Sequence, residues 1–136
     1  MKSVMGNGFR KASIGALLVL ACAVAGAAAA HHSFAATYDS DREQTIEGEV
    51  AQFLFRNPHS MVQVLAPDDT GEMRRWAIEW AGVNALTGEG ISRETLRIGD
   101  RVVVKGNPGR AAEDYRMRML SIRRPLDGWE WRGTFD

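Results

Sequence analysis

The stretch Thr45-Ile46-Glu47-Gly48-Glu49-Val50 alternates apolar or small residues with polar ones. A period of two is typical of a strand with one buried and one solvated face, so it predicts a strand over residues 45–55. Gly48 inside this run indicates a bend or a bulge, which small barrels need in order to curve. The opening segment therefore predicts a curved, half-buried sheet.

Further segments of the same kind follow along the chain. Residues 59–66 and 74–80 both alternate, and the turn residues 67–71 between them predict a hairpin. Two more strands are predicted at residues 101–106 and 115–123. The apolar positions expected to face the core include Val62, Val64, Trp76, Ile78, Trp80, Val102 and Val104.

The segment between the third and fourth strands does not alternate. Residues 83–96 contain Asn84-Ala85-Leu86 and a capping-like Ser92-Arg93-Glu94-Thr95, which predict one or two short helical turns. Strands before and after a short helical connection follow the order of an OB-like five-stranded barrel, so a mostly β fold of this kind is predicted. An irregular small sandwich made of the same strands is the alternative. Trp129, Trp131 and Phe135 form an aromatic tail that we expect to pack back on the body.

The first thirty residues carry the pattern of a secretory signal. Basic residues at Lys2, Arg10 and Lys11 precede an apolar run over residues 12–26, and residues 27–30 are all alanine. A charged start, a short apolar stretch and an Ala-x-Ala site predict a signal-peptide helix that is removed. The mature protein is then expected in the periplasm or secreted, with no stable membrane span.

Two other fates of this leader stay open. The apolar run could remain as a membrane anchor, although it is shorter than the roughly 20 residues of a spanning helix. Lipoprotein processing at Cys22, the single cysteine, is the other alternative, because Val19-Leu20-Ala21-Cys22 resembles a lipobox. The predicted organisation is a signal peptide at 1–30, an extended segment at 31–44 and a barrel domain with its aromatic tail at 45–136.

Removal of the leader changes the charge. The whole chain has 17 basic and 17 acidic residues, and the leader contributes three of the bases and none of the acids. The mature domain then has 14 basic residues against 17 acidic ones, a net charge of −3. This balance gives no electrostatic footprint for nucleic acid, so no nucleic-acid partner is expected.

The three histidines of the chain fall in two places. His31 and His32 follow the expected cleavage site, and His59 stands in Asn57-Pro58-His59. Imidazole and a newly made α-amine are good ligands for copper, nickel and zinc. Cleavage after Ala30 would let the amine and ring of His31 chelate one ion, with His59 as a third nitrogen. Cleavage after Ala29 would place His32 third, which suits square-planar Cu(II) or Ni(II).

The same histidines have an alternative interpretation without a metal. His31 and His32 would be a polar start that aids secretion, and His59 would be a turn residue. Other candidates are weaker. Asp39, Asp41 and Glu43 lack the glycine and distal glutamate of a calcium loop, so we expect a solvated lead-in. Glu79, between Trp76 and Trp80, could be a buried general acid, but pairing with Arg56 or Arg75 is the expectation.

Several motifs occur together in one order: His31-His32-Ser33-Phe34, the strand that starts at Thr45, Asn57-Pro58-His59, Trp76, Asn84-Ala85-Leu86 and Leu96-Arg97-Ile98-Gly99-Asp100. In this combination the chain resembles a family of small exported bacterial proteins of unknown function whose mature chains begin His-His-Ser-Phe. The resemblance implies a periplasmic, single-domain β protein and no established activity. The segment Trp80-Ala81-Gly82-Val83-Asn84 departs from that family's Gly-Gly-Ser/Thr-Pro-Asn.

Three functions follow from these observations. The first is a non-catalytic periplasmic module that binds a partner protein or a small ligand. The second is a copper-binding protein that uses His31, His32 and His59. The third is a copper-dependent oxidative enzyme built on the N-terminal histidine, which is the least favoured because no extended substrate surface is indicated. We therefore expect a binding protein rather than an enzyme.

Overall fold

Strand β1 (Gln44–Leu54) shows why the chain forms a sheet: its buried positions Ile46, Gly48 and Val50 alternate with exposed ones. The computed structural model describes residues 34–135, and the predicted signal-peptide helix, His31 and His32 lie outside these residues. The remaining elements are β2 (Ser60–Pro67), β3 (Met73–Trp80), α2 (Val83–Gly88), β4 (Arg101–Pro108), the 3-10 turn η1 (Ala112–Asp114), β5 (Arg116–Arg124) and β6 (Trp129–Arg132).

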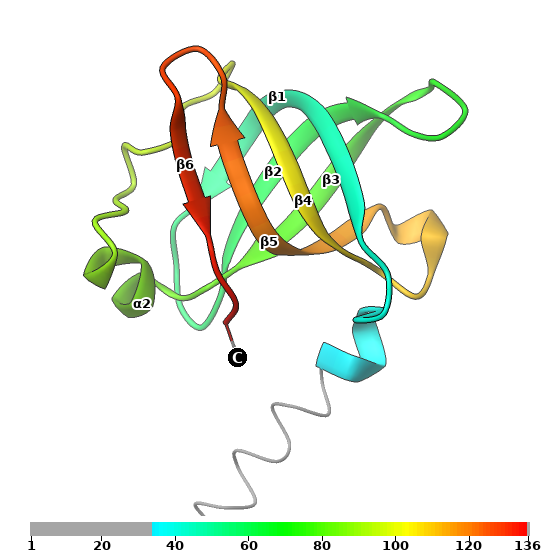
Figure 1. Cartoon of the computed structure of the whole chain (residues 1–136), viewed down its shortest axis with the longest axis horizontal. Helices are drawn as coiled ribbons and strands as arrows, with labels where there is room; N and C mark the ends of the chain where they lie inside the picture. The colour runs from blue at the N-terminus through cyan, green and yellow to red at the C-terminus, as the bar shows by residue number, and fades with distance from the viewer. Residues whose placement is uncertain (1–33, 136) are drawn as a thin grey trace, which may run out of the picture. The chain divides into compact units, whose positions relative to one another are not determined.

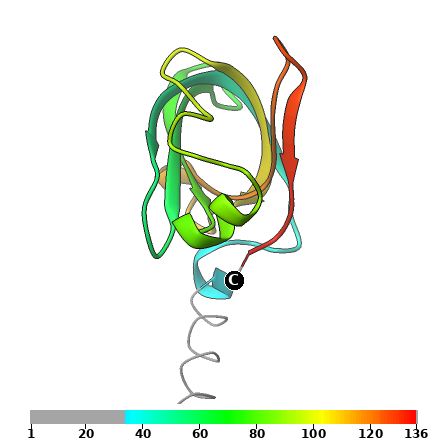
Figure 2. The ribbon, with the colours of Figure 1, turned by 90° about the vertical axis from the view of Figure 1, so that its left-hand side faces the viewer.

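The strands close into a five-stranded barrel (Figure 1). Neighbours in the order β3-β2-β1-β4-β5-β6 are antiparallel, and a parallel pairing of β3 with β5 closes the ring. Figure 2 shows the strands curving round this ring, with α2 and the connection to β4 lying across one end. The predicted OB-like barrel with a helical connection between its third and fourth strands is therefore confirmed, in place of the sandwich alternative.

The aromatic tail does more than pack on the barrel. Trp129–Arg132 forms the sixth strand, β6, which pairs with β5 on the outside of the ring. The Trp131 ring packs edge-on against Trp80, with centroids 5.0 Å apart. The tail is thus part of the sheet.

Curvature of β1 comes from two features rather than one. Gly48 permits a close approach of β2, because a Cβ atom at position 48 would lie 2.0 Å from the carbonyl oxygen of Leu65. The register shift that marks a bulge lies further along, between Val50 and Gln52. The expected bend is therefore shared between a close approach at Gly48 and a bulge two residues later.

The core fills the ring and is closed at the α2 end. The predicted inward residues are buried, among them Val62, Val64, Trp76, Ile78, Trp80, Val102 and Val104. Leu86 of α2, together with Ile91 and Leu96 of the following connection, is also buried. The predicted helical turn is present as α2, and it covers this end of the barrel core together with the non-helical connection that follows it.

The segment before β1 was expected to be extended. Its described part starts with one helical turn at residues 34–37, and Tyr38 then forms an isolated bridge with Gly109. Within residues 34–135, no helix is both long enough and apolar enough to cross a membrane.

Candidate functional site

His59 lies at the edge of the barrel, on the turn from β1 into β2. The side-chain oxygen of Asn57 accepts a hydrogen bond from the backbone N–H of Val83 at 2.9 Å, which ties this turn to the start of α2. Gly82 permits the contact, because a Cβ there would lie 2.4 Å from the carbonyl oxygen of Pro58. The backbone of His59 is thus held by its neighbours, while 29% of its side chain is exposed.

Glu79 of β3 holds the His59 ring. Its Oε1 lies 2.6 Å from Nδ1 of His59, and only 13% of the Glu79 side chain is exposed. Its Oε2 accepts a hydrogen bond from the Tyr38 hydroxyl and lies 3.7 Å from Nη2 of Arg116. An ionised carboxylate only accepts hydrogen bonds, so a neutral His59 ring carries its proton on Nδ1 and its lone pair on Nε2.

Tyr38 is the buried donor of this arrangement, with 2% of its surface exposed. Burial and the adjacent Glu79 carboxylate raise the pKa of the Tyr38 hydroxyl far above its usual range. The phenol therefore stays protonated and donates to Glu79 throughout the physiological pH range. The Arg116 guanidinium lies over the Tyr38 ring, 5.8 Å from its centroid.

The C-terminal segment after β6 also contacts His59. The Phe135 ring meets the imidazole edge-on at a centroid distance of 5.7 Å. Arg118 of β5 lies over the Phe135 ring and donates to its carbonyl oxygen, and the β3–β5 register pairs Arg118 with Glu79. We call this group the His59 cluster: Tyr38, His59, Glu79, Arg116, Arg118 and Phe135.

The predicted metal ligands were His31, His32 and His59. The structure places His59 in the cluster, whereas His31 and His32 fall outside the described residues. Within residues 34–135, no three His, Cys, Asp or Glu side chains gather in a way that could hold a metal ion. The three-histidine site stays a prediction.

The partners of Glu79 differ from the expected ones. An arginine such as Arg56 or Arg75 was expected; the arginine that lies near the Glu79 carboxylate is Arg116, and His59 and Tyr38 contact it as well. Arg75 instead donates to the side-chain oxygen of Gln63 at 2.7 Å. The sequence signal for a site was the lone acid between two core tryptophans, because such a carboxylate needs donors. Nothing local pointed to Tyr38, which is 41 residues away.

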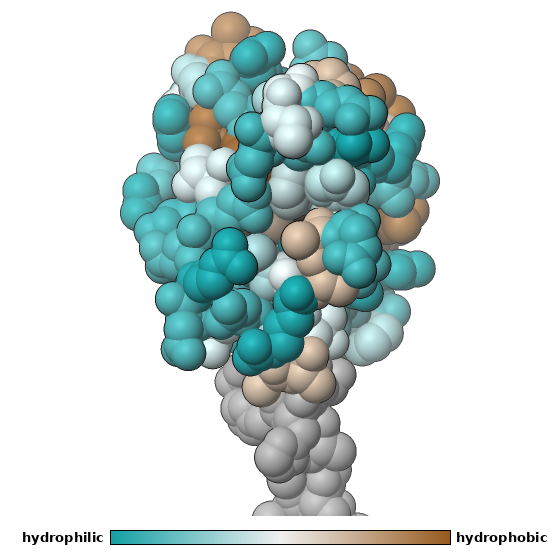
Figure 3. Space-filling view, turned by 90° about the vertical axis from the view of Figure 1, so that its right-hand side faces the viewer, coloured by the Kyte–Doolittle hydropathy of each residue, from teal (hydrophilic) through white to brown (hydrophobic). Residues whose placement is uncertain are grey.

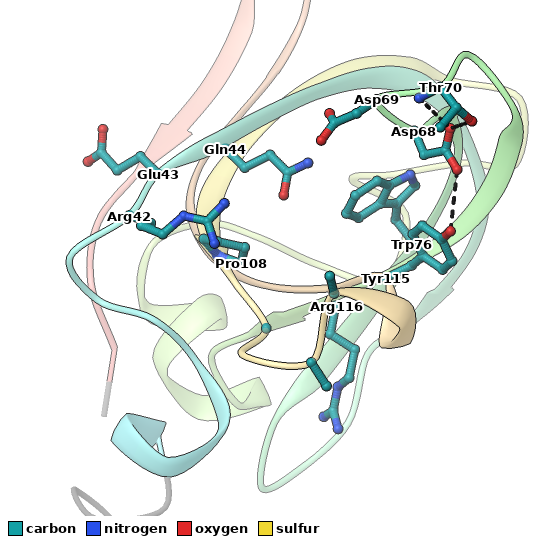
Figure 4. A pocket seen from close by; sticks show the side chains of 13 residues that line it. Arg42, Glu43, Gln44, Asp68, Asp69, Thr70, Trp76, Pro108, Tyr115 and Arg116 are labelled. Carbon is teal, nitrogen blue, oxygen red and sulfur yellow. Dashed lines mark hydrogen bonds between the residues drawn. The ribbon is translucent and has the colours of Figure 1, made fainter.

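A pocket of about 340 Å³ opens between the start of β1, the β2–β3 turn and the β4–β5 connection. Figure 4 shows the side chains of Arg42, Gln44 and Asp69 pointing into it beside the Trp76 indole. We call it the Trp76 pocket; its lining includes Arg42, Gln44, Asp68, Asp69, Trp76 and Tyr115.

Asp68 organises one wall of the Trp76 pocket. Its carboxylate accepts hydrogen bonds from Thr70, Arg74 and the Tyr115 hydroxyl, the last at 3.3 Å. The hydrogen bonds from Thr70 and Arg74 hold the pKa of Asp68 well below its usual range. Asp68 is thus an ionised structural hub that positions Tyr115.

The fold and the site together define a small OB-like β-barrel domain with a carboxylate-held histidine at its edge. The chain belongs to the family of unknown function DUF6152, whose model matches residues 18–117. The matched region contains all three histidines and the first four strands. A comparison with curated proteins found no match.

Proposed function

We propose that this chain is an exported, periplasmic binding domain that holds its ligand without transforming it. The leader pattern over residues 1–30 supports export. The serine next to His59 supports the fold rather than chemistry, because the buried Ser60 hydroxyl donates to the Arg56 carbonyl oxygen at 3.2 Å. As the ligand we propose a transition-metal ion, copper above all, bound by His59 with His31 and His32.

The observation that carries the metal proposal is the hydrogen bond between Nδ1 of His59 and Glu79 at 2.6 Å. Histidines that bind metals almost always donate their second ring N–H to a carboxylate, a carbonyl or water. The bond fixes the ring and selects the tautomer with its lone pair on Nε2, the nitrogen that a metal would bind. Tyr38, by holding the other carboxylate oxygen, keeps Glu79 in place.

The chain itself limits how far the other two histidines can be from this cluster. Tyr38 is anchored on Glu79, and His32 precedes Tyr38 by six residues. A segment of that length spans at most about 22 Å when fully extended. The tether therefore keeps a high effective concentration of imidazole near His59.

The mature N-terminus adds a further nitrogen ligand. An α-amine has an ordinary pKa of about 7.7–8.0, so near neutral pH a metal displaces its proton readily. With His31 first, amine and imidazole chelate through one residue. With Ala30 first, His32 takes the third position, where the amine and backbone amides complete a square-planar set for Cu(II).

The test is a Cu(II) titration of the exported protein, with its N-terminus established by mass spectrometry. We expect one tight site, which His59→Ala weakens by more than tenfold. Glu79→Gln should weaken binding by roughly 10–100-fold, the usual effect of removing an outer-shell partner. Gln63→Ala is a suitable control, because Gln63 contacts Arg75 on the barrel surface, outside the His59 cluster.

Two results would overturn the metal proposal. One is the lack of stoichiometric Cu(II) binding by protein with a native N-terminus. The other is equal affinity in the wild type and in His59→Ala, which would assign the metal to the N-terminal residues alone. Fractionation of the producing cells tests export separately, and a lipid on Cys22 or a retained leader would contradict a free N-terminal amine.

A further inference from the structure

The Trp76 pocket lies in the same domain as the His59 cluster. Its unpaired charged residues, Arg42 and Asp69, are not members of that cluster. Its volume of about 340 Å³ is at the lower end of the range for small-molecule sites, roughly 300–1,000 Å³. The face of the domain that carries the β2–β3 turn and the β4–β5 connection is mostly hydrophilic (Figure 3). The size and surroundings of the pocket suit a small polar molecule.

One wall of the pocket is aromatic and firmly held. The Trp76 indole is 4% exposed and donates from Nε1 to the carbonyl oxygen of Ala66 at 3.2 Å. The Tyr115 ring packs edge-on against it at a centroid distance of 5.3 Å. The Arg74 guanidinium lies over Tyr115, and Asp68 binds its hydroxyl. This wall is therefore preorganised, which lowers the cost of binding a ligand.

The backbone of Tyr115 adds a second sign of a functional position. With φ at 46°, it is the one non-glycine residue between positions 34 and 135 that has positive φ. A bulky residue in the left-handed region is uncommon, and such strain gathers at functional sites. Here the conformation turns the Tyr115 ring toward Trp76 and Asp68.

The charges in the pocket divide into paired and unpaired groups. Asp68 pairs with Arg74, and Glu43 pairs with Lys105 at 2.5 Å. The Arg116 guanidinium points away from Trp76 and lies near Glu79 (Figure 4). The side chains of Arg42 and Asp69, however, make no hydrogen bond or ion pair with any residue of the described chain. The pocket thus presents one unpaired cation and one unpaired anion.

The unpaired polar groups of the pocket come from different segments of the chain. Arg42 comes from the segment that leads into β1, and Asp69 comes from the β2–β3 turn. The Gln44 amide points in between them, and its side chain also lacks a partner within residues 34–135 (Figure 4). A guanidinium forms a fork that matches a carboxylate, whereas a carboxylate attracts an ammonium group.

We infer that the Trp76 pocket binds a small zwitterion of the amino-acid or dipeptide class. Its carboxylate lies on Arg42, its ammonium group on Asp69, and its apolar side chain against the Trp76 indole. Gln44 offers both a donor and an acceptor to the backbone of the ligand. This site contains no histidine, so the outcome of a zwitterion-binding test does not depend on metal binding.

Calorimetric titration of the exported domain with L-phenylalanine and with glycyl-L-phenylalanine tests the inference. Two derivatives of the tighter probe remove one charge each: the N-acetyl form lacks the ammonium group, and the C-terminal amide lacks the carboxylate. We expect each derivative to bind at least ~10-fold more weakly than its parent, since charge-assisted hydrogen bonds are the strong ones. Whichever of the two parent probes binds more tightly shows whether the pocket prefers a free amino acid or a dipeptide.

Variants link each ligand charge to its protein partner. Arg42→Gln should abolish the difference in affinity between the parent probe and its amide. Asp69→Asn should abolish the difference in affinity between the parent probe and its N-acetyl form. Arg123→Gln is the matched control, because Arg123 is exposed on β5, outside the pocket and without a described partner. His59→Ala should leave the affinity unchanged, which separates this site from the proposed metal site.

Three results would overturn the inference. The first is the lack of binding by either parent probe at millimolar concentration. The second is equal affinity for a parent and both its derivatives. The third is an equal loss of affinity in Arg42→Gln and in Arg123→Gln, which would show a general charge effect and no site.

Discussion

The hydrogen bond from Tyr38 to Glu79 supports a sharp prediction about stability. Both groups are largely buried, at 2% and 13% exposure, so solvent screens their interaction little. A hydrogen bond to a charged group contributes about 1.5–3 kcal/mol. In a double-mutant cycle of Tyr38→Phe and Glu79→Ala, we therefore expect a coupling free energy of about 2 kcal/mol.

The isosteric substitution Glu79→Gln refines the magnitude. The glutamine oxygen still accepts from Tyr38, but a neutral acceptor forms a bond about half as strong. The coupling of Tyr38→Phe with Glu79→Gln should then fall to about 1 kcal/mol. Urea unfolding at pH 7, followed by circular dichroism, gives the free energies of all variants.

An exposed ion pair serves as the control for this cycle. Arg101 and Glu47 lie 3.1 Å apart on β4 and β1, with side chains 64% and 54% exposed. Surface pairs of this kind contribute about 0.2–1 kcal/mol. A coupling for Tyr38 and Glu79 no larger than that of Arg101 and Glu47 would refute the idea that a buried hydrogen bond holds the cluster.

Further predictions concern the barrel and two titrating groups. Gly48→Ala should lower the free energy of unfolding by about 3 kcal/mol, because the new Cβ meets the Leu65 carbonyl. Gly88→Ala is the control: its Cβ meets nothing, so urea titrations should show little change in stability. Trp131→Ala should lower the free energy of unfolding by about 3–5 kcal/mol, because it opens a cavity beside Trp80. Trp129→Ala should cost much less, because Trp129 is only partly buried; equal losses would contradict the packing of β6. Because the pKa of Asp68 is lowered in the folded state, its ionised carboxylate stabilises the fold above about pH 4, and this stabilisation is lost as the pH falls through the pKa of the folded state. Melting curves should therefore show that Asp68→Asn loses less stability in acid than the wild type does. Because the pKa of Tyr38 is raised, its stabilisation is present below about pH 10 and is lost as the pH rises further, so Tyr38→Phe should lose less stability than the wild type in alkali, measured in the same way.

Much of the barrel was predictable because alternation along a strand is a local signal. Val62 and Val64 of β2, and Trp76, Ile78 and Trp80 of β3, are buried as their spacing predicted. The parallel pairing of Ala77 with Arg116 and of Glu79 with Arg118 closes the ring, and this register is a property of the whole sheet. It could be inferred only from the order of the elements.

The parts that could not be predicted depend on contacts between distant segments. The segment Trp129–Arg132 does alternate, but a pattern of only four residues is too short to distinguish a strand from an irregular tail. The partners of Glu79 come from the segment before β1, from the β1–β2 turn and from the start of β5, so its position within β3 carried no information about them. The Trp76 pocket likewise combines residues from separate turns.

The most direct test of the metal proposal is pulsed electron paramagnetic resonance of Cu(II) bound to the protein as its producing cells make it, with its native N-terminus. An imidazole that binds copper through one ring nitrogen gives a modulation from the remote nitrogen, so the spectrum reports how many imidazoles are bound. Because Glu79 holds Nδ1 of His59, the metal proposal assigns coordination to Nε2, and it predicts that His59→Ala removes one imidazole from the count. An unchanged modulation in His59→Ala would contradict the assignment of His59 as a copper ligand.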